Sequence, residues 1–542
     1  MKGQMMHRPL KIADLITFAA DTFPDSEIVS VRTEGDIHRT TYGETAKRIA
    51  QLAHGLQGLG IEVGDRIATL AWNGYRHFEL YYGISGIGAV CHTINPRLSA
   101  EQMIYIINHA KDRLLFVDLT FVPIIEKLRE HLPEDLRVVI MTDRAHMPET
   151  SLEGVLCYEE ILDCQPDHMD WPDFPEETAA GLCYTSGTTG NPKGTLYSHR
   201  STVLHAYSLC VTLPKVLQEG SRILPVVPLF HVNAWGLPYS APLSGASMIF
   251  PGGALDGKSL YDLMEREKVF SAWGVPTVWL GLMNEINQRG RLPDGLGDIV
   301  VGGSAAPRSL IEGFEKQGVN VCHAWGMTEM SPLGTQGNLP PRMDDWSMKD
   351  RIDRKQSQGR RVFGVDLKIV DDEGNRLPHD GKTPGHLYVR GNSITSGYFE
   401  NPEASKLVFD EEGWFCTGDI AAITSDGFLV ITDRSKDLIK SGGEWISSLD
   451  LENIVMSHSG VANCAVIAVP HPKWDERPLL IIQSKDDDAP PPSAHAEPAA
   501  DDVQRVLAQM LGVPNPQAQA TELSPSREGM TIAQLDWRPI QM

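Results

Sequence analysis

Helices and strands alternate along the first third of the chain. Apolar residues at helical spacing run through 49–59, and a short apolar run follows at 66–72. The same order of helix and strand recurs at 101–118 and at 121–141. This alternation is typical of an α/β fold with parallel strands, because each helix returns the chain to the same edge of a sheet. The sequence therefore predicts an α/β fold built from layers of sheets and helices.

A loop rich in glycine and hydroxyl residues lies between Tyr184 and Gly194 and ends with a lysine. Glycines let backbone N–H groups turn toward an anion, hydroxyl groups add donors, and a lysine supplies positive charge for phosphate. The residues expected to contact ATP phosphates are Thr185, Ser186, Gly187, Thr188, Thr189, Gly190 and Lys193. A Walker A loop is excluded, because Pro192 stands where it needs glycine and Gly194 where it needs serine or threonine. Residues 187–190 alone would also fit a flexible surface loop.

Composition restricts the class of protein. With 542 residues and 42% hydrophobic residues, several subdomains are expected. The net charge of -23 argues against non-specific binding to nucleic acid. The eight cysteines form no C-x-x-C pair, which predicts reduced thiols without a disulfide or structural zinc. Because the N-terminus has no signal-peptide pattern and no segment is apolar enough to span a membrane, we expect a cytoplasmic protein.

Besides the phosphate loop, two motifs that end in an acidic residue could contribute to a nucleotide site. In Trp325-Gly-Met-Thr-Glu329, Thr328 could donate to the α-phosphate and Glu329 could bind Mg²⁺, although a helix N-cap would explain the pair as well. Asp419, after Trp414-Phe-Cys-Thr-Gly, could accept both ribose hydroxyls, and an Asx turn is the alternative.

A histidine follows an apolar run in Pro228-Leu-Phe-His231. A lone histidine of this kind is most often a core or loop residue. If the segment is helical, Trp235 lies on the same face as His231, four residues on.

Together these motifs resemble those of the adenylate-forming superfamily, specifically the acyl-CoA synthetases, over about residues 10–483. The resemblance implies that a carboxylate attacks the α-phosphate of MgATP to give acyl-AMP and pyrophosphate, after which the thiol of CoA displaces AMP. It implies an ATP site completed by Gly302, Gly303, Ser304, Trp325, Gly326, Asp419 and Arg434. It also implies catalytic roles for His231, Thr328, Glu329 and Lys436, and an acid pocket of His231, Trp235 and Gly326.

The resemblance also predicts the domain organisation. Residues 1–432 would form a large N-terminal ATP- and acid-binding domain of layered sheets and helices with a small β-barrel subdomain. Residues 433–485 would begin a small mobile α+β C-terminal domain that swings about Lys436, and residues 486–542 read as an atypical low-complexity tail. The residues implied on the CoA side are Lys440, Gly442, Gly443, Glu444 and Trp445.

Within the superfamily, Ala71-Trp-Asn73, the segment 88–98 and Ser441-Gly-Gly-Glu-Trp-Ile446 look most like the medium-chain branch, which includes the 3-methylmercaptopropionyl-CoA ligases. A fatty acid of four to eight carbons or 3-methylmercaptopropionate is therefore the expected substrate. Trp235, Trp273 and Trp279 suggest a short, filled pocket, although tryptophans in apolar runs are more often plain core. A homodimer is the default expectation for the oligomeric state.

One family feature is missing. Members of the family carry a C-terminal lysine that bridges the acid and the phosphate during adenylation, and residues 486–542 contain no lysine. Arginine is a wide, forked group and a poor replacement for a point charge. Three explanations remain: an error in the sequence of the tail, an enzyme that adenylates slowly, or a catalytically impaired homologue that binds ATP or acyl-adenylate without efficient turnover.

Overall fold

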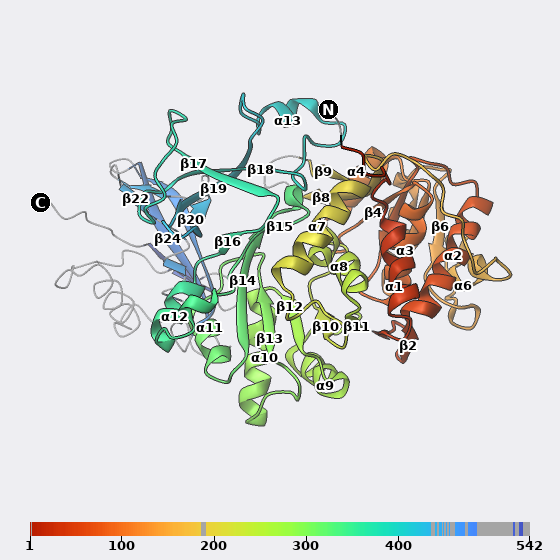
Figure 1. Cartoon of the computed structure of the whole chain (residues 1–542), viewed down its shortest axis with the longest axis horizontal. Coiled ribbons are helices and arrows are strands. Elements are labelled where there is room, and N and C mark those ends of the chain that lie inside the picture. The colour runs from red at the N-terminus through yellow and green to blue at the C-terminus, as the bar shows by residue number, and fades with distance from the viewer. Residues whose placement is uncertain are drawn as a thin grey trace, which may run out of the picture.

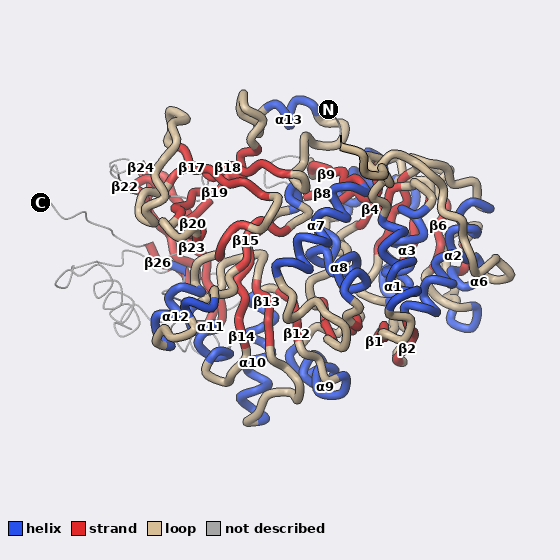
Figure 2. The backbone as a smooth tube through the Cα atoms, viewed as in Figure 1, coloured by secondary structure: helices blue, strands red, loops and turns tan. Residues whose placement is uncertain are grey.

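Two large sheets and the helices around them form most of the molecule (Figures 1 and 2). The computed structural model describes residues 1, 3–185, 191–434, 439–441, 444–446, 448, 451–452, 455, 461–471, 475–484, 524–525 and 530–534. The predictions for 186–190, Lys436, Gly442 and Gly443, and for most of the tail after 485, lie outside these residues.

The first sheet has seven strands in the order β7-β6-β5-β3-β4-β8-β9, and only the β8–β9 pair is antiparallel. Its strands are β3 (Arg66–Leu70), β4 (Val90–Thr93), β5 (Leu114–Val117), β6 (Arg137–Ile140), β7 (Leu156–Cys157), β8 (Ala179–Thr185) and β9 (Lys193–Ser198). The strands predicted near 66–72, 114–118 and 136–141 are confirmed as β3, β5 and β6, and they are parallel as expected.

The second sheet has thirteen strands in the order β17-β18-β19-β20-β16-β15-β14-β13-β12-β10-β11-β1-β2. Its parallel part consists of β1 (Glu27–Val31), β10 (Arg222–Pro225), β11 (Ser247–Phe250), β12 (Ser271–Gly274), β13 (Asp298–Val301) and β14 (Asn320–Gly326), with β2 (Ile37–Thr41) antiparallel at one edge. The other strands are antiparallel: β15 (Leu333–Gln336), β16 (Gly359–Arg361), β17 (Val365–Val370), β18 (Gly385–Gly391), β19 (Phe415–Ile423) and β20 (Phe428–Arg434). These antiparallel strands continue the path of the parallel strands in the same sheet.

The helices form three layers around the two sheets. A core shared by both sheets encloses α1 (Ile12–Thr22), α2 (Tyr42–Gly58), α3 (Tyr75–Gly86), α7 (His199–Thr212) and α8 (Leu237–Ser244). The outer face of the first sheet packs on α4 (Ala100–Ala110) and α5 (Val122–Leu128), and that of the second on α9 (Gly257–Glu267), α10 (Pro276–Arg289) and α11 (Arg308–Glu315). The remaining α-helices are α6 (Tyr158–Leu162), α12 (Met348–Lys355) and α13 (Pro402–Lys406), and 3₁₀ turns lie at Leu119–Phe121, Arg129–His131, Arg144–His146 and Pro341–Met343.

Alternate residues of a strand contribute to the two hydrophobic cores on either face of the first sheet. In β5, Leu114 and Phe116 belong to the core between the sheets, while Leu115 and Val117 belong to the outer core with α4 and α5. Successive side chains of a strand point to opposite faces, so a strand covered on both faces is apolar throughout. Helix α4 begins with a capping box in which the Ser99 hydroxyl and the Gln102 side chain each bond the other residue's backbone N–H.

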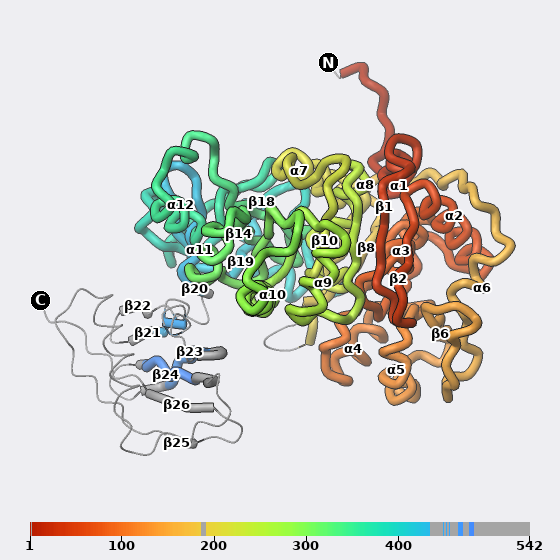
Figure 3. Tube along the Cα trace, turned by 90° about the horizontal axis from the view of Figure 1, so that it is seen from below, coloured from red at the N-terminus to blue at the C-terminus, as the bar shows by residue number. Residues whose placement is uncertain are grey.

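The strands after β20 form a third sheet, apart from the two large ones (Figure 3). It contains β21 (Ile439–Ser441), β22 (Glu444–Ile446), β23 (Val461–His471), β24 (Asp475–Ser484), β25 (Ser524–Pro525) and β26 (Met530–Gln534). Strand β26, which lies beyond residue 485, pairs antiparallel with β24. Among the described residues, no helix combines the length and the apolar character that crossing a bilayer requires.

Candidate functional site

A cavity of about 490 Å³ lies where β12, β13 and β14 end and is closed by residues from both large sheets. The carboxyl ends of parallel strands are the usual place for ligands in open α/β sheets. Ten of the residues predicted from the sequence line it: Thr185, Lys193, His231, Trp235, Gly302, Gly303, Trp325, Gly326, Thr328 and Glu329. Residues far apart in the sequence are therefore brought to one cavity of a size that suits a small ligand.

Both ends of the loop predicted to bind phosphate line this cavity. Thr185 ends β8 and Lys193 begins β9, and the two residues pair across the strands. The Lys193 ammonium lies 5.1 Å from the centroid of the Tyr398 ring. The backbone N–H of Phe399 donates to the carbonyl of Gly194 at 2.8 Å, so the segment around Tyr398 fixes the end of the loop.

Glu329 is held by several hydrogen bonds in a short 3₁₀ turn, η5 (Thr328–Met330). The Tyr398 hydroxyl donates to Glu329 Oε1 at 2.8 Å, and the Thr395 N–H donates to the Glu329 carbonyl at 2.7 Å. The Tyr197 hydroxyl donates to the Thr328 carbonyl at 2.7 Å. Burial and the neighbouring Glu329 carboxylate raise the pKa of Tyr398, so its hydroxyl stays protonated and donates.

These surroundings fit a magnesium ion bound together with a phosphate. Among the described residues there is no cluster of three histidine, cysteine, aspartate or glutamate side chains that could hold a metal. Mg²⁺ is commonly bound by one or two carboxylates and by phosphate oxygens, so the single carboxylate of Glu329 suits an ion that arrives with ATP.

On another wall, the Trp325 indole N–H donates to Asp419 Oδ2 at 3.1 Å. Asp419 is buried in β19, directly after Thr417 and Gly418, which line the cavity. Its backbone is the register partner of Arg434 in β20. The sequence predicted these three residues at a nucleotide site; the Trp325 and Asp419 side chains meet, and the backbones of Asp419 and Arg434 pair.

His231 and Trp235 both line the cavity, but the geometry expected of them is wrong. The segment Val232–Gly236 is a short 3₁₀ turn in which Val232, Asn233, Ala234 and Trp235 have φ angles of 39°, 57°, 43° and 56°. A right-handed helix is therefore absent here, and the i,i+4 argument does not apply. Left-handed backbone is costly for residues with a Cβ atom, and such strain gathers at functional sites.

The imidazole of His231 keeps an exposed surface toward the cavity that it lines. The protein around it lowers its pKa, because burial disfavours the charged form. At neutral pH His231 is therefore uncharged, and it can donate or accept one hydrogen bond without repelling Lys193.

The apolar part of the cavity is formed by two tryptophans. Trp235 and Trp273 lie with ring centroids 6.5 Å apart, and the same cavity is lined by Leu209 of α7 and by Leu213, which caps that helix. Trp279 is fully buried elsewhere, with its N–H donating to the carbonyl of Gly274 at 3.1 Å. The interpretation of Trp279 as a pocket residue is therefore wrong, because α10 turns it into the outer core.

Two of the predicted glycines are required by close packing. A Cβ atom on Gly326 would lie 2.0 Å from the carbonyl oxygen of Pro332, and one on Gly302 would lie 3.0 Å from the Trp235 ring. A side chain at either position would displace the wall of the cavity. Gly303 has a φ of 81°, which favours glycine at the turn after β13.

The remaining predicted residues are not brought to the cavity by the described part of the chain. Ser304 is exposed and is not among the described residues that line it. Lys440 and Trp445 are described as backbone only, as register partners in β21 and β22, next to Glu444. Tyr398 was missed by the sequence analysis. Its one signal is its place in the turn Ser396-Gly-Tyr398, which carries no chemistry of its own.

Known proteins match the chain over most of its length. The sequence profile of the AMP-binding enzyme family matches residues 16–399, and that of the AMP-binding enzyme C-terminal domain matches residues 450–526. The 3-methylmercaptopropionyl-CoA ligase of Ruegeria lacuscaerulensis is 49% identical over 492 residues, covering 90% of each chain. The medium-chain-fatty-acid–CoA ligase of Ectopseudomonas oleovorans is 49% identical over 484 residues, covering 89% of this chain and 88% of that protein.

Among solved structures, the anthranilate CoA ligase AuaEII in complex with anthranoyl-AMP superimposes with a TM-score of 0.80 at 25% identity, covering 98% of this chain and 97% of that one. The predicted fold class, enzyme class and co-substrates, ATP, Mg²⁺ and CoA, are confirmed. The chain belongs to the AMP-binding enzyme family, and within it to the ATP-dependent acid–CoA ligases that form an acyl-adenylate.

Proposed function

We propose that this ligase activates 3-methylmercaptopropionate or a fatty acid of four to eight carbons. The observation that carries the proposal is the lining of this cavity, which combines Lys193 and Glu329 with the apolar walls of Trp235 and Trp273. Such walls suit a short acyl chain, while the charged groups suit the phosphates and metal of MgATP. The names of the two relatives at 49% identity support the same range of acids.

The described residues have defined tasks in adenylation. Glu329, oriented by Tyr398, would hold Mg²⁺ together with phosphate oxygens, and the ion would offset negative charge on the departing pyrophosphate. Lys193 supplies positive charge, and the backbone at Gly302 and Gly326 lets the adenylate lie close to the walls. His231, as a neutral imidazole, would hold the acid near the α-phosphate, so that catalysis depends mainly on positioning and charge stabilisation.

Thioester formation would use the C-terminal residues. Lys436 is proposed as the pivot of a domain rotation, after which Lys440, Gly442, Gly443, Glu444 and Trp445 contact CoA. The proposed domains are 1–432, 433–485 and the tail 486–542, and the profile match at 450–526 extends the C-terminal domain into the tail. A cytoplasmic location and a homodimer belong to the same proposal.

A second candidate is a homologue that binds ATP or acyl-adenylate but turns over poorly. Residues 486–542 contain no lysine, so the family's bridging cation has no point-charge equivalent there. Arg527 in Ser526-Arg-Glu-Gly529 is the nearest remnant.

Pyrophosphate release with MgATP distinguishes the candidates when it is measured with and without CoA across butanoate, octanoate and 3-methylmercaptopropionate. Release that depends on CoA and prefers one of these acids supports the ligase and gives its substrate. Absence of release with every acid, while ATP still binds, supports the impaired homologue instead.

A further inference from the structure

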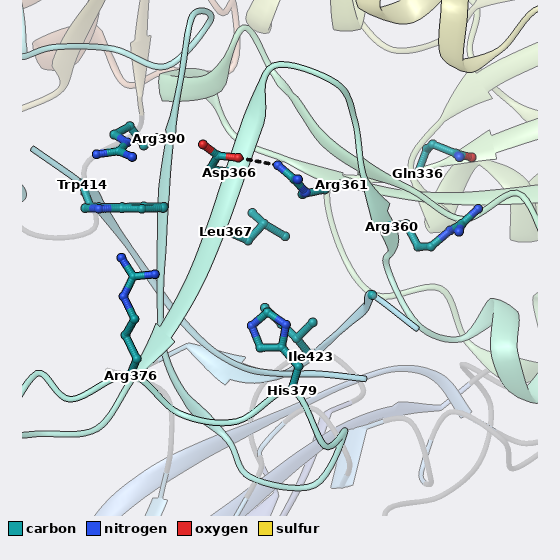
Figure 4. Close-up of a pocket in the computed structure, with 11 residues that line it drawn as sticks. Gln336, Arg360, Arg361, Asp366, Leu367, Arg376, His379, Arg390, Trp414 and Ile423 are labelled. Atoms are coloured by element: carbon teal, nitrogen blue, oxygen red, sulfur yellow. Dashed lines mark hydrogen bonds and ion pairs between the residues drawn. The ribbon is translucent and has the colours of Figure 1, made fainter. Parts of the chain in front are cut away.

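A second concave region lies on the antiparallel part of the large sheet. It has a volume of about 620 Å³ and is formed by β15 to β19 and by the connection between β17 and β18. We call it the arginine pocket, because Arg360, Arg361, Arg376 and Arg390 line it together with His379 and Trp414 (Figure 4). Gln336 lines both this pocket and the cavity described above, so the two sites are neighbours that share this residue.

The arginine pocket is rich in positive charge, whereas the whole chain has a negative net charge. Four guanidinium groups line it with one carboxylate, Asp366, in a chain whose net charge is -23. Asp366 forms an ion pair with Arg361. A guanidinium nitrogen of Arg376 lies 3.6 Å from Oε2 of Glu412. Among the described residues, no carboxylate lies within ion-pair distance of Arg360 or Arg390. The pocket therefore keeps positive charge that its own acids do not offset.

Trp414 provides an independent sign of a ligand. The guanidinium carbons of Arg390 and Arg376 lie 4.4 and 5.5 Å from its ring centroid, on opposite sides of the ring in Figure 4. The side chain is only 4% exposed, and its Nε1–H has no hydrogen-bond acceptor among the described residues. A buried N–H without an acceptor is costly, and an anionic oxygen would satisfy it.

An aromatic side chain extends the site. A second hollow of about 710 Å³ shares Arg361, Asp366 and Arg390 with the arginine pocket and is also lined by Phe363. Phe363 is 89% exposed, which is unusual for so large an apolar side chain. An exposed aromatic ring beside arginines is an arrangement on which a nucleotide base can stack while its phosphates are bound.

We propose that the arginine pocket binds the phosphate groups of a nucleotide, outside the cavity that takes ATP. The forked guanidinium groups of Arg376 and Arg390 would each donate two hydrogen bonds to a phosphate, which lysine cannot reproduce, and Trp414 Nε1–H would donate to a third oxygen. One source of this chemistry is the nucleotide end of CoA, an assignment that rests on the proposed function. The other source is a free nucleotide.

Calorimetric binding of adenosine 3′,5′-bisphosphate tests the site, with saturating AMP present to fill the ATP cavity. The double variant Arg376→Gln, Arg390→Gln is expected to bind the bisphosphate at least tenfold more weakly than the unaltered chain. Arg144→Gln is the matched control, because Arg144 is 77% exposed and pairs with Glu160 at 3.4 Å on a distant surface. Unchanged affinity in the double variant overturns the proposal.

Two milder variants keep the test decisive if the double variant does not fold. Arg390→Lys retains the positive charge but loses the forked guanidinium group. Trp414→Phe retains an aromatic ring but loses the indole N–H. Each is expected to weaken bisphosphate binding severalfold. Binding equal to that of the unaltered chain in both overturns the proposal.

Steady-state kinetics with CoA and with pantetheine then show whether the pocket binds the nucleotide end of CoA or a free nucleotide. If the pocket binds CoA, the KM for CoA rises at least fivefold in Arg390→Lys, while the KM for pantetheine, which lacks the nucleotide, is unchanged. Weaker bisphosphate binding with an unchanged KM for CoA assigns the pocket to a free nucleotide. Pyrophosphate release from acid and MgATP without CoA, followed in the same variants, reports on the proposed function independently of this pocket.

Discussion

The carboxylate of Glu329, which we propose as a ligand of Mg²⁺, is held in place by its neighbours. Its side chain is buried, and one of its oxygens is occupied by the Tyr398 hydroxyl at 2.8 Å. The same tyrosine ring lies 5.1 Å from the Lys193 ammonium. Tyr398 thus orients the carboxylate proposed to hold Mg²⁺ and contacts the lysine proposed to bind phosphate, so we propose it as a positioning residue for both.

Replacing Tyr398 with phenylalanine removes the hydroxyl and keeps the ring beside Lys193. A hydrogen bond to a charged group contributes about 1.5–3 kcal/mol, so we expect adenylation to fall about tenfold or more. The concentration of Mg²⁺ for half-maximal pyrophosphate release should rise in parallel. Tyr207→Phe on the exposed side of α7 is the control, since Tyr207 is 46% exposed. An unchanged Mg²⁺ dependence in Tyr398→Phe would show that the hydroxyl does not orient Glu329.

Gly326 gives a second prediction at this scale. Because a Cβ atom there would lie 2.0 Å from the Pro332 carbonyl oxygen, Gly326→Ala must displace the backbone beside the cavity. Overpacking of this kind costs about 1–3 kcal/mol, so the melting temperature should fall together with adenylation. Gly58→Ala, at a position with no atom within 4 Å of the added Cβ, should retain both. Retention of full activity and stability by Gly326→Ala contradicts the packing described here.

At the scale of elements, helix α7 joins parts of the molecule that are distant in sequence. Nδ1 of His199 accepts the Ile12 N–H at 3.1 Å, and Nε2 of His205 accepts the Leu333 N–H at 3.1 Å. Both imidazoles are buried, and burial lowers the pKa of His199 to about 4 and that of His205 to about 3. They accept these hydrogen bonds because they are neutral.

These two histidines predict how stability depends on pH. Their pKa values are lower in the folded chain than the usual 6.5, so the unfolded chain binds more protons as the pH falls below about 6.5. Their stabilising contribution is therefore complete above that pH and is lost as the pH falls toward 4, by at most about 1.4 kcal/mol per pH unit for each histidine.

Urea unfolding at pH 7 and pH 5 checks this prediction. The loss of unfolding free energy between the two pH values should be smaller in His205→Gln than in the unaltered chain. His168→Gln is the control, because His168 is 82% exposed, and it should behave as the unaltered chain does. Equal losses in His205→Gln and the unaltered chain would contradict the role given to α7.

The sequence predicted which segments form helices and strands better than it predicted the backbone conformation of individual turns. The alternation of helix and strand gave α2, β3, α4 and β5, because amphipathic periodicity depends on residues close together in the chain. The left-handed turn at Val232–Gly236 could not be foreseen, because the positive φ angles of Val232, Ala234 and Trp235 do not follow from residue type. The motifs that carry chemistry were also found because their residues lie close together in the chain.

Residues without a motif were missed or misplaced. Tyr398 acts through contacts with Glu329 and Lys193, which are distant in sequence and meet only in the fold. Trp279 looked like a pocket residue until the direction of α10 placed it in the outer core. The arginine pocket draws on several strands and a connecting loop, so no single segment of the sequence indicates it.

For the whole molecule, the absence of a lysine from residues 486–542 predicts an imbalance between the two half-reactions. The resemblance to the family implies that adenylation uses a C-terminal lysine, whereas the transfer of a finished acyl-AMP to CoA does not use that bridge. We therefore expect the rate constant of thioester formation from supplied acyl-AMP to exceed that of adenylation by at least tenfold. Stopped-flow measurement of each half-reaction checks this, and a faster adenylation step would show that another group replaces the lysine.

The most direct measurement is a chemical quench of the enzyme with MgATP and 3-methylmercaptopropionate or octanoate, followed by mass analysis of the products. The structure and the family predict acyl-AMP in stoichiometric amount with the enzyme when CoA is left out, and its complete conversion to acyl-CoA and AMP when CoA is added. Bound ATP that remains intact with every acid, with no acyl-AMP formed, would contradict the assignment of this cavity as an adenylation site.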